Sequence, residues 1–214
     1  MTSPDTFNTT WNQCGCASQT SCKSSSAESL FASIQNGNIV CNLGTSSGFH
    51  IKTASENAGA AGKVIIIAPV PSSFSSVQKE VLSYDITNTE LRLGDVDSLP
   101  IESNTIDIIA GENSLTKNKN RDTIIMEFSR ILRSHGKLVL SEIIGFCVAS
   151  CLTNPREFDS FKTLLSSELN QCLQLHNFSI DSIDISPDES INYSNSAGSA
   201  STVALTAIIR ASKV

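Results

Sequence analysis

The sequence lacks any apolar run of the roughly 20 residues that a membrane-spanning helix needs, and its 214 residues contain no dense cluster of Lys and Arg. Basic residues number 15 against 21 acidic residues, for a formal net charge of −6. Nucleic-acid phosphates need concentrated positive charge, so this balance argues against nucleic acid as the main partner. We therefore expect no nucleic acid and no membrane, but a small-molecule substrate, with a protein partner or a homo-oligomer left open.

A secretory signal is also lacking, because the first 29 residues are polar rather than charged and then apolar. The seven cysteines form an odd set, and a chain of this length can build a core without disulfide staples. Reduced thiols or metal ligation then explain the cysteines better than a secreted framework does. These observations predict a cytoplasmic protein.

The chain divides into an arm and one domain. Residues 1–28 are rich in Ser, Thr, Asn and Gln, lack a hydrophobic period and contain Cys14, Cys16 and Cys22, so they predict a flexible arm. Regular apolar patterns begin at Ser29. Residues 29–214 are therefore predicted to form a single domain.

Short apolar runs alternate with helical periods along that domain. Strands are expected over residues 39–43, 63–68, 90–93, 105–110, 137–143, 178–185 and 202–209. Helices are expected over residues 49–61, 75–84, 120–133 and 155–175, and a polar loop over 187–201. Residues 64–67 are apolar on both faces, which is typical of a parallel sheet covered by helices. The alternation predicts an α/β three-layer sandwich.

The most informative stretch is CNLGTSSGF, residues 41–49, between the first predicted strand and helix. Doubly wound α/β proteins hold nucleotide-like ligands at such a junction. Glycine allows the backbone to approach the ligand closely, and the helix N-terminus offers unpaired N–H groups. The candidate cofactor-binding residues here are Asn42, Gly44, Ser46 and Gly48.

Four segments in order carry a family resemblance: IVCNLGTSSGF at residues 39–49, LGDVDSLP at 93–100, SNTIDII at 103–109 and EFSRILRSHGKLVLSEI at 127–143. They resemble the class I methyltransferases that use S-adenosylmethionine, and most resemble arsenite methyltransferases. The resemblance implies a Rossmann-like, mostly parallel seven-stranded sheet with an antiparallel terminal strand pair. It also implies S-adenosylmethionine as the cofactor, with Gly44, Gly48 and Asp95 at matching positions and Asp95 beside the adenine.

Three positions depart from the family's pattern. Asn42 replaces the first acid, Ser46 fills the middle glycine position, and Ala68 and Pro69 stand where an acid binds the ribose hydroxyls. Each charge-assisted hydrogen bond from such a carboxylate contributes about 1.5–3 kcal/mol, so its loss costs roughly tenfold or more in affinity. The sequence therefore predicts a degenerate cofactor motif with lost or altered use of S-adenosylmethionine.

The cysteines are candidate ligands for a soft metal. Arsenite methyltransferases hold As(III) with thiolates, and Cys147 and Cys151 follow the fifth predicted strand, where the family places one such cysteine. The arm cysteines Cys14, Cys16 and Cys22 could close over Cu(I), Zn(II) or As(III), or be surface thiols without a metal. The remaining two cysteines, Cys41 and Cys172, lie in apolar contexts and are expected in the core.

Candidate acid–base residues cluster at predicted strand ends. His50 begins the helix after the glycine loop, where an imidazole could act near neutral pH or could simply be solvated. Glu112 follows the fourth strand and Glu142 ends the fifth, at the edge where open α/β sheets bind ligands. Asn113, next to Glu112, is a further candidate cofactor-binding residue. A Glu112 and Glu142 pair could perform acid–base chemistry if one carboxyl were desolvated.

The other two histidines have structural interpretations: His135 as a helix terminator and His176 as a turn residue. Three functional hypotheses follow. The favoured one is a methyltransferase-fold enzyme that catalyses cyclisation, isomerisation or elimination of a small molecule with His50, Glu112 or Glu142. The alternatives are an active methyltransferase on a small molecule or metalloid, and a non-enzymatic protein that binds a soft metal through thiols.

Overall fold

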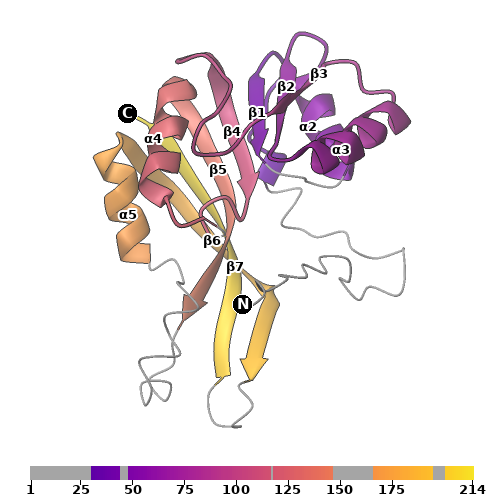
Figure 1. Ribbon diagram of the computed structural model, residues 1–214. Coiled ribbons are helices and arrows are strands. Elements are labelled where there is room, and N and C mark those ends of the chain that lie inside the picture. Colours follow the sequence, from indigo (N-terminus) through magenta and orange to yellow (C-terminus); the bar gives the residue numbers. More distant parts are fainter. Residues whose placement is uncertain (1–29, 44–47, 117, 147–165, 195–200) are drawn as a thin grey trace, which may run out of the picture.

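A seven-stranded sheet forms the centre of the protein (Figure 1). The computed structural model describes residues 30–43, 48–116, 118–146, 166–194 and 201–214. The strands are β1 (Ile39–Leu43), β2 (Lys63–Ala68), β3 (Thr89–Leu93), β4 (Ile106–Glu112), β5 (Leu132–Phe146), β6 (Phe178–Ser194) and β7 (Ser201–Lys213). The helices are α2 (Gly48–Ala58), α3 (Pro71–Ser83), α4 (Arg121–Ile131) and α5 (Ser166–Leu175).

The strand order is β3-β2-β1-β4-β5-β7-β6. The five strands from β3 to β5 run parallel, whereas β7 is antiparallel to both of its neighbours. This order confirms the predicted parallel sheet with an antiparallel terminal pair. The chain leaves β1 toward β2 on one side and later returns to β4 on the other, so the sheet has its topological switch point between β1 and β4.

Two hydrophobic cores lie on opposite faces of the sheet. On one face, Ile51 of α2 and Val77 of α3 pack over β1, β2 and β4. On the other face, Phe128 of α4 and Leu173 of α5 pack over β4, β5 and β7. The two helical layers confirm the predicted three-layer sandwich (Figure 1).

Local capping shifts two predicted helix boundaries. Helix α3 begins at Pro71 rather than at residue 75, because proline suits the first helical turn and Ser73 Oγ accepts a hydrogen bond from the Val70 N–H group at 3.3 Å. Helix α4 ends at Ile131, two residues early, and His135 lies within β5 with a φ of 63°. The interpretation of His135 as the helix terminator was therefore wrong.

The C-terminal part contains more strand than the sequence predicted. Strand β6 continues to Ser194 and β7 begins at Ser201, so most of the predicted loop over 187–201 is a long antiparallel hairpin that extends beyond the helices (Figure 1). A register shift between Ser186 and Ile191 accommodates Pro187, which has no N–H group to donate. Polar composition alone did not reveal this pairing.

Other predictions fall partly or wholly outside the described residues. The arm over 1–28 is one of these, and so is the first half of the predicted helix over 155–175, of which α5 covers the rest. Among the described helices, none is long and apolar enough to cross a membrane.

Candidate active site at the carboxyl edge of the sheet

The candidate site lies where β1, β4 and β5 end. Asn42 of β1 is fully buried and pairs in register with Ala110, two residues before Glu112 at the end of β4. Gly48 is the first residue of α2, so the start of this helix faces the same edge. Gly44 and Ser46, the other predicted cofactor residues, lie outside the described residues.

The structure brings His50 and Glu112 together. The His50 Nδ1 atom lies 3.1 Å from Glu112 Oε1, and the His50 side chain is only 15% exposed. The buried Phe31 ring packs against the imidazole, with centroids 5.7 Å apart and planes inclined by 51°. His50 is therefore a held, half-buried residue rather than a solvated residue of the first helical turn.

Glu142 has a different environment, because it is completely buried. Its Oε1 atom accepts a hydrogen bond from the Leu115 N–H group at 2.9 Å, and its Oε2 atom accepts two from the N–H and hydroxyl groups of Thr116, at 2.9 and 2.6 Å. Burial raises the pKa of this carboxyl, while these hydrogen bonds oppose the shift. Glu142 anchors the turn after β4.

The two carboxylates do not meet. Glu112 is in register with Ser141, and successive residues of a strand point to opposite faces, so Glu142 lies on the other side of the sheet. The contacts agree, since Glu112 meets His50 of α2 whereas Glu142 bonds to Leu115 in the core under α4. The sequence hypothesis of a Glu112 and Glu142 pair therefore has no geometric support.

Asn113 continues the polar edge after β4. Its backbone has a φ of 53°, and its N–H group donates a 2.7 Å hydrogen bond to the Ser141 carbonyl. The Oδ1 atom is buried and has no hydrogen-bond partner among the described residues. A buried acceptor without a partner is costly, and a ligand at this edge could supply the missing donor.

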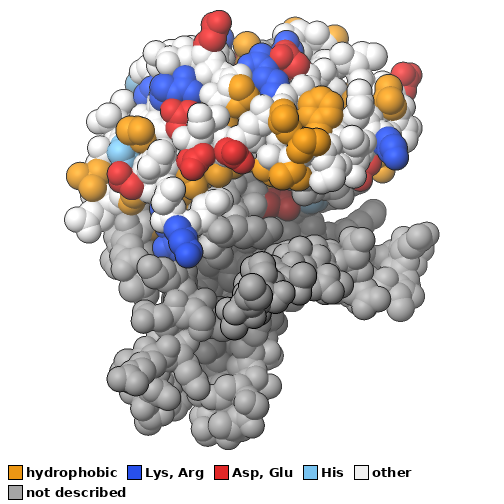
Figure 2. Space-filling view, viewed as in Figure 1, with side chains coloured by type: hydrophobic (Ala, Val, Ile, Leu, Met, Phe, Trp, Pro, Cys, Tyr) orange, Lys and Arg blue, Asp and Glu red, His pale blue; other side chains and the backbone are white. Residues whose placement is uncertain are grey.

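The ends of β2 and β3 are mostly apolar. Ala68 is buried, and its carbonyl accepts a 3.0 Å hydrogen bond from the Gly94 N–H group. Val70 and Leu93 are about half exposed at the same edge, and hydrophobic side chains gather on this side of the surface (Figure 2). Asp95 is exposed just after β3, and its carbonyl accepts a 3.1 Å hydrogen bond from the Ser98 N–H group.

The cysteines separate into three groups. Cys41 is fully buried and its burial raises the thiol pKa to about 12, which confirms the predicted core position. The proposed metal ligands Cys14, Cys16, Cys22, Cys147 and Cys151 all lie outside the described residues.

The prediction of a core position for Cys172 was wrong in part. This side chain packs against the core but is only half-buried, and its thiol also lies near Asp122 and His176. The sequence signal for this cluster is the four-residue spacing of Cys172 and His176 at the end of one helix, which sequence reasoning did not use.

Comparisons with known proteins agree with the fold described above. A family model described as "Methyltransferase domain" matches residues 41–140. An arsenite methyltransferase from Halobacterium salinarum is 25% identical over 114 residues, which cover 53% of this chain and 29% of that protein. The matched segment thus spans under a third of the curated relative's length.

Solved structures agree on the fold. A SAM-dependent methyltransferase from Aquifex aeolicus superposes with a TM-score of 0.63 at 16% identity, over 86% of this chain and 89% of that one. The [4+2]-cyclase SpnF superposes with a TM-score of 0.67 at 15% identity, over 87% and 79%. The chain therefore shares the fold of these proteins, and residues 41–140 are similar to the methyltransferase domain.

The fit of S-adenosylmethionine to this methyltransferase-like edge is incomplete. The end of β2 offers the buried methyl group of Ala68 where a carboxylate would have to bind the ribose diol, and β1 offers the amide of Asn42. Asp95, which the resemblance places beside the adenine, is exposed just after β3. At the positions of Asn42 and Ala68 the described residues therefore offer no carboxylate.

Proposed function

We propose that this protein is a small-molecule enzyme on a methyltransferase fold whose S-adenosylmethionine binding is weakened and whose reaction is a proton-transfer process: cyclisation, isomerisation or elimination. The observation that carries the proposal is the 3.1 Å contact between His50 and Glu112 at the switch point of the sheet. Ligands of open α/β folds bind at this point.

The contact pairs a proton acceptor with a group that orients it. Glu112 Oε1 lies at ion-pair distance from Nδ1 without the alignment of a hydrogen bond. A proton on Nδ1 would leave Nε2 able to accept a proton from a substrate. Packing against Phe31 restricts the ring, so little orientational freedom remains to be lost in the reaction.

The apolar side of the edge supports a substrate other than a nucleoside. Val70 and Leu93 are about half exposed and present hydrocarbon next to Ala68, where the family pattern calls for a charged contact with a sugar. An apolar surface binds an apolar organic molecule by removing its area from water. The likeness to SpnF supports this proposal, because that neighbour is a cyclase on the same fold.

An active methyltransferase is the second candidate. The match to the methyltransferase family and to an arsenite methyltransferase favours it, as does the retained Asp95. Thiol-based binding of Cu(I), Zn(II) or As(III) by the arm cysteines is the third. The cytoplasmic location and the absence of a nucleic-acid partner remain predictions from composition.

The acid–base proposal can be tested with a substrate that reports proton abstraction directly. In 5-nitrobenzisoxazole, a base removes the ring proton, the N–O bond breaks and a coloured cyanophenolate forms without any cofactor. We expect saturable turnover that falls at least tenfold in His50→Asn and in Glu112→Gln. Lys52→Ala, an exposed substitution on the same helix, is the matched control. Turnover equal in all four proteins would refute the proposed dyad.

Calorimetry with S-adenosylmethionine separates the first two candidates. The proposal expects dissociation constants above about 100 μM, because the ribose carboxylate is replaced by Ala68. Saturable binding in the low micromolar range would favour the methyltransferase candidate instead.

A further inference from the structure

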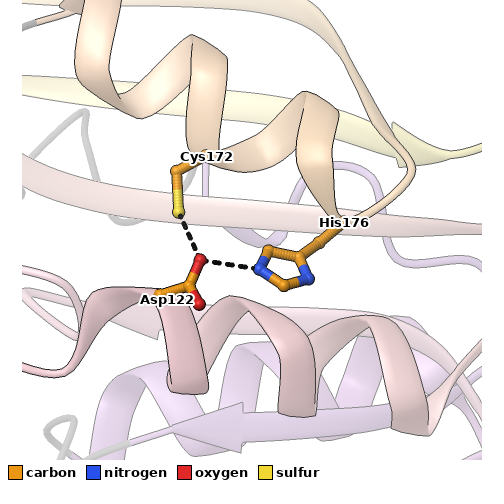
Figure 3. A group of neighbouring side chains, drawn as sticks. All are labelled: Asp122, Cys172 and His176. Carbon is orange, nitrogen blue, oxygen red and sulfur yellow. Dashed lines mark hydrogen bonds and ion pairs between the residues drawn. The ribbon is translucent and has the colours of Figure 1, made fainter.

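Three metal-ligating side chains meet where α4 and α5 lie side by side (Figure 3). Asp122 lies in the first turn of α4, Cys172 in α5, and His176 directly after α5. The Asp122 Oδ1 atom is 2.8 Å from His176 Nε2 and 3.7 Å from Cys172 Sγ. All three donor atoms lie within 4.8 Å of one another, outside the carboxyl-edge site.

The fold holds these side chains in place. Cys172 and His176 are four residues apart, which puts them on the same side of a helix. The His176 N–H group donates a 3.1 Å hydrogen bond to the Leu173 carbonyl, and Asn177 follows with a φ of 63°, so the chain turns sharply after the histidine. Below the cluster, Leu173 and Phe128 belong to one buried core that fixes α5 relative to α4.

We propose that Asp122, Cys172 and His176 bind one Zn²⁺ ion, with water as the fourth ligand. Carboxylate oxygen, thiolate sulfur and imidazole nitrogen are the donor types that zinc takes in proteins. Zinc bonds of about 2.0–2.3 Å in a tetrahedron place ligand atoms roughly 3.3–3.7 Å apart. The 3.7 Å distance between Cys172 Sγ and Asp122 Oδ1 already fits this range. The 2.8 Å distance between His176 Nε2 and Asp122 Oδ1 has to increase by about half an ångström.

Exposure leaves room for the fourth ligand. The Asp122 side chain is 76% exposed, so the ion would sit at the surface with one side toward water. Arg121, whose charge acts on the Cys172 thiol, donates its Nε hydrogen to the Leu115 carbonyl at 3.1 Å. The other two ligands are more enclosed, since the His176 side chain is 20% exposed.

Binding exchanges a proton for the metal. Burial and the neighbouring Asp122 charge raise the pKa of the Cys172 thiol, so the metal-free thiol keeps its proton at neutral pH. The hydrogen bond from His176 lowers the pKa of the Asp122 carboxyl. On binding, the S–H bond breaks, the S–Zn bond forms and the thiol proton passes to the buffer. The neutral imidazole of His176 takes the tautomer with its proton on Nδ1, which leaves the Nε2 lone pair for the metal.

The test uses the reduced full-length chain with its other non-core cysteines, Cys14, Cys16, Cys22, Cys147 and Cys151, replaced by serine. Metals held by those cysteines are then not counted. Titration with Co²⁺ should give one ion per chain and a near-ultraviolet thiolate charge-transfer band, and Zn²⁺ should displace the ion and abolish the band. No band at 1 mM Co²⁺ would overturn the proposal.

Single ligand replacements in the same background identify the site. Cys172→Ser should abolish the band, and His176→Gln should weaken Zn²⁺ binding at least tenfold. His135→Gln, which changes an exposed histidine elsewhere, should leave both unchanged. A band retained after Cys172→Ser would contradict the assignment.

A second measurement avoids substitutions altogether. In the unmodified chain, Zn²⁺ should slow alkylation of Cys172 by iodoacetamide at least tenfold, as followed by peptide mass spectrometry, and should raise the unfolding temperature. Equal alkylation of Cys172 with and without Zn²⁺ would refute the site even if the serine variants fail to fold.

Discussion

The two faces of the sheet treat acidic side chains differently at the same edge. On the α4 and α5 face, Glu142 is fully buried and every hydrogen bond it accepts holds the turn after β4. On the α2 and α3 face, Glu112 is about one-third exposed and contacts only His50 among the partners described for its carboxylate. Thus Glu142 of β5 stabilises the fold, whereas Glu112 of the neighbouring strand β4 remains accessible to a ligand.

The largest effect is expected from Glu142→Gln. The amide cannot accept all three hydrogen bonds, so buried donors of Leu115 and Thr116 lose their acceptor and the free energy of unfolding falls by about 2–3 kcal/mol. Urea unfolding measures this loss, with exposed Glu102→Gln as the control. A loss below about 0.5 kcal/mol would show that Glu142 is not a structural anchor.

The pH dependence of that loss has a defined sign. Because the folded-state pKa of Glu142 is raised, its contribution to stability is fully present below its ordinary pKa of 4.5 and decreases as pH rises through the raised value. The penalty of Glu142→Gln should therefore be larger at pH 4.5 than at pH 8. Unfolding curves at the two pH values check this, and the reverse order would contradict it.

Glu127→Gln on the same face should show the opposite dependence. Glu127 accepts two hydrogen bonds from Arg130 and one from the Leu99 N–H group, and the Arg130 contacts lower its pKa. Its contribution is present above pH 4.5 and is lost as pH falls through the lowered folded-state value. We expect a penalty of about 1–2 kcal/mol at pH 7 that shrinks below pH 4.5. A penalty independent of pH would exclude this ionic role.

Introducing a carboxylate at the end of β2 tests the proposed weakening of S-adenosylmethionine binding. Ala68→Asp returns an acid to the end of β2 and should tighten S-adenosylmethionine binding about tenfold, equivalent to about 1.4 kcal/mol. Calorimetry measures the change, and the isosteric Ala68→Asn variant controls for size without charge. No difference between the two variants would mean that the missing acid is not what weakens the cofactor site.

The smallest stability effect is expected from Glu112→Gln. Its carboxylate is partly exposed, so its ion pair contributes little, and the free energy of unfolding should change by less than about 0.5 kcal/mol. Unfolding experiments on this variant and on Glu142→Gln under identical conditions sharpen the contrast between the two acids. If Glu112→Gln lowered the free energy of unfolding as much as Glu142→Gln, the two acids would not differ in their structural role.

Sequence patterns predicted the sheet better than the site. Runs such as residues 64–67 indicate a buried parallel strand whatever their neighbours are, so the strand set and layers followed directly. The face on which a strand-end acid points depends on register, which one strand alone does not fix, and so Glu112 and Glu142 looked equivalent. The Phe31 contact with His50 depends on tertiary packing and has no local signal.

The Asp122 cluster illustrates the same limit. Cys172 lies in α5 and His176 directly after it, but Asp122 is 50 residues before Cys172. Only the packing of α4 against α5 brings the three side chains together. Likewise, the polar residues after Ser186 resemble a loop in composition, whereas cross-strand pairing with β7 makes them strand. Long-range pairing overrode local preference in both places.

The two edge strands of the sheet determine whether another polypeptide can pair with its backbone. A long, straight border strand offers unpaired N–H and C=O groups on which another polypeptide could add. Here the border at β3 is only five residues long, and the border at β6 is broken by its irregular register at Pro187. Neither side therefore provides a continuous template, so the same sequence that lengthens the final hairpin also protects it against self-association through backbone pairing.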